Sequence, residues 1–168
     1  MSKVYLISDH HFGHENARKF EPSRKGQSIN EHDEWLIDCH NSVVKKRDLT
    51  YFLGDVCFGQ VMHMHDCIKQ MQGRKVLVMG NHDNYEMAAY EAVFDNVLAL
   101  KQYSGKRVFT HVPIHPSCMD RWKLNFHGHI HSLKAPDGPY VNVCVEQCEG
   151  VPRTIDEWIE ASLSLIHI

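Results

Sequence analysis

The feature that most constrains this chain is a series of short apolar runs, each followed closely by Asp, Asn or His. Residues 76–79 read Val-Leu-Val-Met and lead directly into Gly-Asn-His-Asp at 80–83. Residues 4–7, Val-Tyr-Leu-Ile, lead in the same way to Asp9 and His11. A continuous apolar run of this length is typical of a strand buried on both faces. We therefore expect the polar side chains to meet where parallel strands end, at the carboxyl edge of a sheet.

The first half of the chain predicts strands that alternate with helices. Strands are expected at residues 4–7, 49–53 and 75–79, and helices at 30–46, 60–71 and 85–94, with Asn30 as the N-cap of the first helix. This alternation indicates a sheet whose strands are joined by helical crossovers.

The second half is richer in strands. Short strands are expected at residues 97–102, 107–111, 123–127 and 140–145, and a capping box at 154–157 opens a further helix. An α/β fold of two packed mixed β-sheets flanked by helices accommodates both halves. The 168 residues are 43% hydrophobic without a compositional break, which predicts a single domain over 1–168. Residues 163–168 have no cap or turn signal and are expected to form a tail.

Charge and apolar content exclude several classes of protein. A formal net charge of −3 lacks the basic excess of a protein that grips many phosphates, so we expect no stable nucleic-acid binding. We find no signal peptide and no apolar run long enough to span a bilayer. Six cysteines occur without a CxxC pair and are expected to be free thiols. These features predict a cytoplasmic protein, and they do not indicate its oligomeric state.

Seven candidate metal ligands follow the predicted strands. They are Asp9, His11, Asp55, Asn81, His111, His129 and His131. Each has an ordinary alternative, because Gly-Asp is usually a turn and His111 could be a hydrogen-bonded core histidine. Together they would bury several carboxylates and imidazoles without compensation, which is costly. Bound metal ions remove that cost.

The spacing of these residues suggests how they converge. In extended backbone, the side chains of residues i and i+2 point to the same side. The side chains of Asp9 and His11 can therefore point to one place, and so can those of His129 and His131. Glycines at 54, 80 and 128 permit tight turns and close approach of the backbone beside them.

The ordered motifs resemble those of the calcineurin-like metallophosphoesterase superfamily. They are Asp-x-His at 9–11, Gly-Asp at 54–55, Gly-Asn-His-Asp at 80–83, His111 and Gly-His-x-His at 128–131, and the resemblance extends over residues 4–145. The stretches SDHHFGHEN, GDVCFG, HVP and FHGHIH are similar to those of small bacterial and phage phosphoesterases. The resemblance implies a four-layer α/β/β/α sandwich.

The resemblance also implies two divalent metal ions bridged by Asp55 and by a water or hydroxide that attacks phosphorus in line. Asp9, His11 and His131 would complete one metal, and Asn81, His111 and His129 the other. Mn²⁺ is expected, with Fe, Zn or Ni as alternatives. His82 would protonate the leaving oxygen or stabilise the transition state, and Asp83 is a candidate to orient His82.

The expected substrate is a small, nucleotide-like or cyclic phosphodiester. His14, Asn16 and Arg18 are candidates to reach its phosphate, and the alternative for them is a solvated loop. A phosphomonoesterase is the alternative function. A non-enzymatic metal-binding scaffold and a nuclease are less favoured, because the motifs retain every ligand and the chain lacks basic excess. A protein phosphatase is disfavoured, because GDVCFG lacks the second Asp and the Arg of its Gly-Asp-x-x-Asp-Arg-Gly motif.

Overall fold

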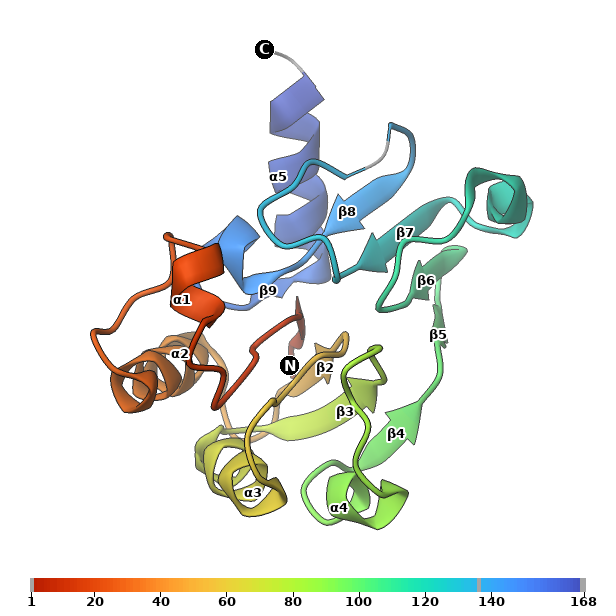
Figure 1. The fold of residues 1–168 in the computed structure, drawn as a ribbon. Coiled ribbons are helices and arrows are strands. Elements are labelled where there is room, and N and C mark those ends of the chain that lie inside the picture. The colour runs from red at the N-terminus through yellow and green to blue at the C-terminus, as the bar shows by residue number, and fades with distance from the viewer. Residues whose placement is uncertain (1, 136, 167–168) are drawn as a thin grey trace.

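The structure is a computed structural model that describes residues 2–135 and 137–166. Within these residues the strands form two mixed β-sheets, one in the order β4-β3-β2-β1-β9 and one in the order β5-β6-β7-β8 (Figure 1). The first sheet contains β1 (Val4–Ile7), β2 (Leu49–Phe52), β3 (Arg74–Val78), β4 (Asn96–Leu98) and β9 (Arg153–Thr154). The second contains β5 (Lys101–Tyr103), β6 (Arg107–Phe109), β7 (Leu124–His127) and β8 (Tyr140–Asn142). The edge strands β9 and β5 run antiparallel to their neighbours, and the other pairs are parallel.

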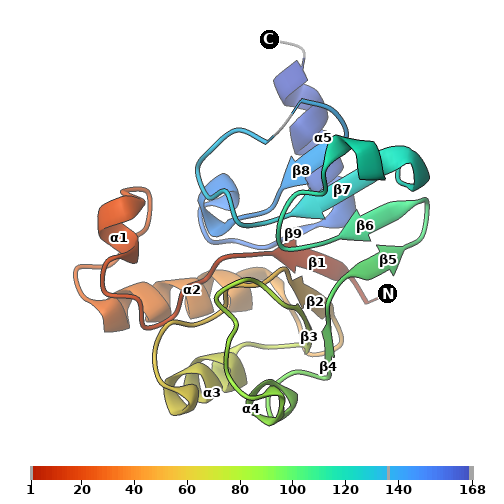
Figure 2. The ribbon, with the colours of Figure 1, turned by 45° about the vertical axis from the view of Figure 1, so that its right-hand side comes forward.

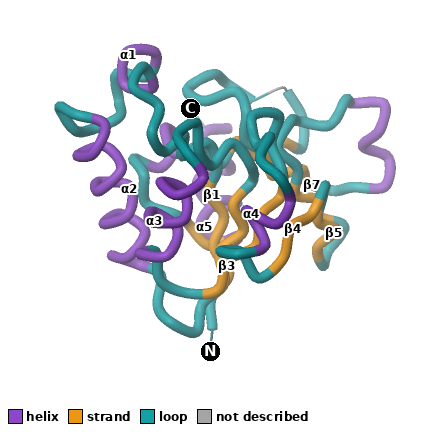
Figure 3. Tube along the Cα trace, turned by 60° about the horizontal axis from the view of Figure 1, so that its bottom comes forward, coloured by secondary structure: helices purple, strands orange, loops and turns teal. Residues whose placement is uncertain are grey.

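Helices flank the two sheets. They are α1 (Ala17–Phe20), α2 (Ile29–Val43), α3 (Val61–Gln70), α4 (Met87–Glu91), α5 (Ile155–Ile166) and the 3-10 helices η1 (Pro116–Arg121) and η2 (Val145–Cys148). Helices α2, α3 and α4 lie on the side of the first sheet away from the second sheet (Figures 1 and 2). Helices α2 and α3 lie side by side (Figure 3), and α5 contacts β1, β8 and β9. The predicted fold class is confirmed.

Two neighbouring residues of β2 show how the layers pack. The ring of Tyr51 lies 5.3 Å from that of Phe109 of β6, so this face of the first sheet packs on the second sheet. The ring of Phe52 points to the other face, where it lies 5.9 Å from His40 of α2 and 5.5 Å from Phe94. All five of these side chains are buried, so both faces of β2 are covered, and the two neighbouring residues point to opposite faces as the alternation of side chains along a strand requires.

The structure corrects several of the predicted boundaries. The run at 97–102 was predicted as one strand, but β4 belongs to the first sheet and β5 to the second, so the chain crosses between the sheets at residues 99–100. Helix α2 begins after Ser28, not Asn30, because the Ser28 hydroxyl accepts a hydrogen bond from the Glu31 amide at 3.2 Å. Residues 163–166 continue α5 where a tail was predicted, and residues 167–168 lie outside the described part of the chain.

Every helix in the described part of the chain is too short or too polar to span a bilayer.

Because His40 is buried, we expect the free energy of unfolding to fall in mild acid. Its Nε2–H donates to the carbonyl oxygen of Gln72 at 2.9 Å, and burial lowers its pKa from 6.5 to about 4. Below pH 6.5 the unfolded chain therefore binds more protons than the folded chain, so the free energy of unfolding falls as the pH drops towards 4, by about 3 kcal/mol. Denaturant titrations in EDTA at several pH values should show this fall in the wild type and a smaller one in His40→Gln. Equal losses in both proteins would contradict the prediction.

Candidate metal centre

The predicted ligands lie in loops that follow strands of both sheets. Asp9 follows β1, Asp55 follows β2, Asn81 follows β3, His111 follows β6 and His129 follows β7. Backbone hydrogen bonds join these loops, from the Asp9 amide to the Gly54 carbonyl at 3.0 Å and from the Gly128 amide to the His111 carbonyl at 2.8 Å. Residues far apart in the chain therefore meet at the carboxyl ends of the parallel strands.

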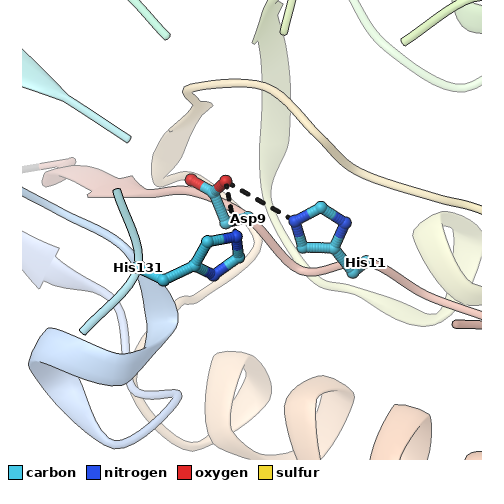
Figure 4. Close-up of side chains that lie close together, drawn as sticks. All are labelled: Asp9, His11 and His131. Carbon is cyan, nitrogen blue, oxygen red and sulfur yellow. Dashed lines mark ion pairs between the residues drawn. The ribbon is translucent and has the colours of Figure 1, made fainter. Parts of the chain in front are cut away.

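Asp9, His11 and His131 form the first cluster (Figure 4). The Asp9 Oδ1 atom lies 3.5 Å from His11 Nε2 and 3.7 Å from His131 Nε2. Asp9 and His11 are buried, and His131 is partly exposed. Their ligand atoms all lie within 4.8 Å of one another, which is close enough for one metal ion to contact all three.

The two carboxylate oxygens of Asp9 have different surroundings. Oδ2 accepts hydrogen bonds from the Ser8 hydroxyl at 2.5 Å, the His129 amide at 2.9 Å and the Cys144 thiol at 3.2 Å. Oδ1 is buried and accepts no hydrogen bond from the described residues, and neither ring nitrogen of His11 makes one. Burial alone would raise the pKa of Asp9, but the neighbouring His11 and the charge of His111 hold it well below its ordinary value. An ionised oxygen without a donor, facing two imidazoles, suits a metal cation.

Asp55, His111 and His129 form the second cluster, and Asn81 adjoins it. The Nδ1–H of His111 donates to the Leu53 carbonyl at 2.7 Å, which leaves Nε2 to face the cluster. This Nε2 lies 2.9 Å from Asn81 Oδ1, 3.2 Å from His129 Nδ1 and 3.3 Å from Asp55 Oδ2. Burial would lower the pKa of His111, but Asp55 and Asp9 raise it to about 9. Four nitrogen and oxygen atoms thus lie close together, and those of Asp55, His111 and His129 are all within 4.8 Å of one another, close enough for one metal ion to contact them.

Asp55 of the second cluster also faces the first cluster. Its Oδ2 atom is 3.9 Å from His11 Nε2 of the first cluster and 3.3 Å from His111 Nε2 of the second. Its Oδ1 atom accepts a hydrogen bond from the His82 amide at 2.9 Å. One carboxylate oxygen is therefore directed towards both clusters.

The backbone at this site is left-handed where the sequence predicted extended chain. The φ angles are 62° at Asp9, 53° at His11, 52° at Asp55, 72° at His129 and 49° at His131. Residues other than glycine rarely adopt such positive φ angles. These angles persist where contacts with the surrounding structure hold the backbone in place, often at functional sites. The explanation of convergence through extended i, i+2 pairs is therefore wrong. Left-handed turns bring these side chains together instead.

Two glycines allow the loops to approach one another this closely. A Cβ atom on Gly80 would collide with the Asp55 carboxylate, and one on Gly128 would collide with Ser8 Oγ and Asp9 Oδ2. Both positions require the smallest residue because a carboxylate occupies the space of a side chain. This agrees with the close approach predicted from the sequence.

Arg24 and Glu146 support the first cluster, and the sequence analysis missed both. The buried Arg24 guanidinium donates to the carbonyl oxygens of Asp9 at 2.6 Å and His10 at 2.8 Å. Its Nε donates to Glu146 Oε1 at 2.7 Å, and the same oxygen lies 3.1 Å from His131 Nδ1. The carboxylate therefore holds His131 with Nε2 directed to the cluster, an arrangement common among metal-binding histidines.

A third group of potential ligands, Asp33, His63 and Cys67, lies between α2 and α3. Asp33 already accepts hydrogen bonds from the Gly13 amide at 2.9 Å, His32 Nδ1 at 2.8 Å and His63 Nε2 at 2.6 Å. Burial raises the pKa of Cys67 to about 12, so its thiol is protonated. This group therefore fastens the loop around Gly13 to the two helices.

His82 and Asp83 have separate surroundings. The His82 ring lies 4.5 Å from that of Phe58 and 6.2 Å from that of His11, beside the clusters. The buried Asp83 carboxylate accepts hydrogen bonds from the amides of Asp55, Val56 and Gly80 at 2.9, 3.0 and 2.8 Å. Asp83 therefore joins the loops after β2 and β3, which corrects the expectation that it orients His82.

A cavity of about 160 Å³ adjoins the first cluster. The described residues that line it are His11, His14, Ala17, Phe20, Glu21, Arg24, Phe58, His82 and His131. Of the three residues predicted to bind substrate, His14 is in this lining. Arg18 instead donates to the Gly26 carbonyl at 2.7 Å, and exposed Asn16 precedes α1, so the structure does not bring these two into the cavity. Phe20 and Phe58 were not predicted to line a cavity, although Phe58 lies in the GDVCFG stretch.

The fold and the clusters define an α/β protein whose loops could hold metal ions at the carboxyl ends of its strands. No family model matches the chain. It is 31% identical over 147 residues to the uncharacterized protein MJ1445 of Methanocaldococcus jannaschii, which covers 84% of this chain and 77% of that protein. The chain belongs to the same family as MJ1445.

Two further proteins are similar to this chain. The Gene 66 protein of Mycobacterium phage L5 is 34% identical over 109 residues, which cover 58% of this chain and 52% of the phage protein. The crystal structure of AQ665 from Aquifex aeolicus, a protein of unknown function, matches with a TM-score of 0.72 and 26% identity over 96% of this chain and 100% of that chain. These names state no activity, and the solved structure supports the fold.

Proposed function

We propose that this chain is a metal-dependent phosphoester hydrolase, and more specifically a phosphodiesterase acting on small, nucleotide-like or cyclic diesters. The main support is the position of Asp55, whose Oδ2 atom lies 3.9 Å from a histidine nitrogen of one cluster and 3.3 Å from one of the other. A carboxylate shared between two ligand sets is suited to a pair of metal ions.

The donor atoms fit such a pair. Asp9, His11 and His131 would hold one ion, Asn81, His111 and His129 the other, and Asp55 both. Mixed nitrogen and oxygen ligands suit Mn²⁺, Fe, Zn²⁺ or Ni²⁺, and we propose Mn²⁺. When bound, the ions would polarise the phosphoryl oxygens and supply a water of lowered pKa as nucleophile.

His82 is the proposed proton donor to the leaving oxygen. Its amide donates to Asp55 Oδ1 at 2.9 Å, which fixes its backbone beside the clusters, and its ring lines the cavity. A side chain so placed can reach an ester oxygen without being a metal ligand.

Replacing His82 by alanine should therefore separate chemistry from metal binding. We expect kcat to fall by about 10²–10⁴-fold, the usual contribution of a general acid, while metal content stays at the wild-type level. Steady-state kinetics and elemental analysis of the same preparation measure the two effects. A variant that loses its metals would show that His82 is a ligand instead.

The charges in the cavity favour a diester over a monoester. A monoester dianion is usually held by a free cationic side chain in addition to metal ions. Arg24 is the arginine in the described lining, which contains no lysine, and its guanidinium is already bound to Glu146 and to two backbone carbonyls. A diester carries one negative charge fewer and does not need that cation.

The proposal is tested by a panel of phosphomonoesters, linear diesters and 2′,3′- and 3′,5′-cyclic nucleotides, assayed with Mn²⁺ and accompanied by elemental analysis. We expect hydrolysis of small diesters and no cleavage of long DNA or RNA. Preferred hydrolysis of monoesters would support the phosphomonoesterase alternative. A metal-loaded chain inert towards every ester would contradict the proposal.

A further inference from the structure

Four neighbouring rings lie in the lining of the cavity that adjoins the first cluster. The centroid of Phe20 lies 6.3 Å from that of His14, His14 lies 4.5 Å from Phe58, and Phe58 lies 4.5 Å from His82. Phe20 is 72% exposed and Phe58 is 41% exposed, although both border the cavity. Exposed phenylalanines gathered at a pocket mark a site where apolar surface is covered by a ligand.

The cavity is suited to a single planar group. Its volume of about 160 Å³ is below the roughly 300–1,000 Å³ of pockets that enclose a whole drug-sized ligand. Aromatic rings stack favourably on flat heterocycles, and this stacking tolerates many ring chemistries. His11 and His131 of the first cluster are in the lining together with His82, so a group held here can stay attached to a phosphate at the clusters.

We propose that this cavity is a nucleobase subsite, in which Phe20 and Phe58 stack on the base of a nucleotide whose phosphate lies at the two clusters. The inference rests on the function proposed above, because the phosphate is placed by the same metal ligands. Phe20 is the last residue of α1, which lies away from the sheets (Figure 2), and Phe58 lies in the loop between β2 and α3, so two separate segments contribute the stacking surface.

The charges in the lining specify the kind of nucleotide. Arg24 is already bound to Glu146, so it offers no free positive charge to a second phosphate. The carboxylate of Glu21 in the same lining repels further phosphates and can accept a hydrogen bond from an N–H group of a base. These two side chains favour a nucleotide with one phosphate over a polyphosphate.

Competitive inhibition tests the stacking directly. AMP and ribose 5-phosphate differ only in the base, and each can be measured at initial rates against hydrolysis of bis(p-nitrophenyl) phosphate by the Mn²⁺-loaded chain. We expect AMP to bind about tenfold more tightly, as one base stacked on aromatic rings would. Phe20→Ala and Phe58→Ala should bring the ratio of inhibition constants towards one, whereas Phe58→Tyr should retain it. Leu100→Ala, which removes an exposed apolar side chain between β4 and β5, is the matched control and should leave the ratio unchanged.

A measurement independent of turnover separates this inference from the proposed function. Saturation-transfer NMR with adenosine and the Zn²⁺-supplemented chain should show saturation transferred to the base protons, and Phe20→Ala and Phe58→Ala should each reduce that signal severalfold. If the chain hydrolyses no ester but still transfers saturation to the base protons, the proposed hydrolase activity is contradicted and the proposed nucleobase subsite is supported. An active chain with equal inhibition by AMP and ribose 5-phosphate would overturn the subsite, and tighter binding of a single-stranded 20-nucleotide DNA than of AMP would overturn its assignment to a small nucleotide.

Discussion

Asp55→Asn is expected to lower kcat by about 10²–10³-fold, on the scale of losing one strong electrostatic contact to the transition state. Asparagine keeps the shape of the side chain and can still accept the hydrogen bond from the His82 amide through its oxygen. It removes the negative charge that faces both His11 and His111. Two cations held close together depend on that charge, so metal content should fall with turnover.

Asp66→Asn is the matched control for this substitution, because Asp66 is an exposed aspartate on α3, away from both clusters. Kinetics and elemental analysis after gel filtration should show wild-type values for Asp66→Asn. Full metal content and unchanged turnover in Asp55→Asn would contradict the shared role of this carboxylate.

The sequence was sufficient to predict that the candidate metal-binding side chains meet at one edge of the sheet, because this follows from the order of the strands. Apolar runs that end in Asp9, Asp55 or Asn81 were recognised as buried strands, and parallel neighbours must present their carboxyl ends on one edge. The left-handed backbone was not predictable in the same way. Its φ angles depend on contacts such as that from the His129 amide to Asp9, between residues 120 positions apart.

The supporting residues had no sequence signal at all. Arg24 lies in an irregular loop and Glu146 in a short 3-10 helix, 122 residues further along the chain, so neither periodicity nor a motif links them. Asn16 and Arg18 were chosen for closeness in sequence to the first ligands, but the chain turns so that Arg18 reaches Gly26 instead. Sequence distance is a poor guide within loops because their backbone direction is set by tertiary contacts.

The division of residues 97–102 between two sheets has a similar cause. The run has the composition of one strand, and its local propensity is satisfied equally by one strand or by two shorter ones. Pairing with neighbouring strands decides where the run is divided, since Val97 pairs with Leu77 of β3 and Gln102 pairs with Val108 of β6. These partners lie in different sheets, so the run must leave one sheet before it enters the other.

Arg24→Met is expected to lower both the free energy of unfolding and the affinity for metal. Glu146 would keep its buried negative charge without the cation that compensates it, which typically costs about 3–5 kcal/mol. The Asp9 and His10 carbonyls would lose their donors, and Glu146 would no longer be held against His131. Loss of a residue that holds a metal ligand in position typically lowers metal affinity about 10–100-fold. Denaturant unfolding in EDTA and titration with Mn²⁺ measure the two effects separately.

Two variants show whether these effects come from the pair or from the arginine alone. In Arg24→Met/Glu146→Met neither charge of this ion pair is left buried without its partner, so stability should recover in part. Metal affinity should stay low because His131 Nδ1 has lost the carboxylate that fixes it. Arg18→Met, in the same loop, removes one hydrogen bond to Gly26 and should have little effect on metal affinity. If Arg24→Met unfolds at the wild-type denaturant concentration and binds Mn²⁺ as tightly, then Arg24 does not support the first cluster.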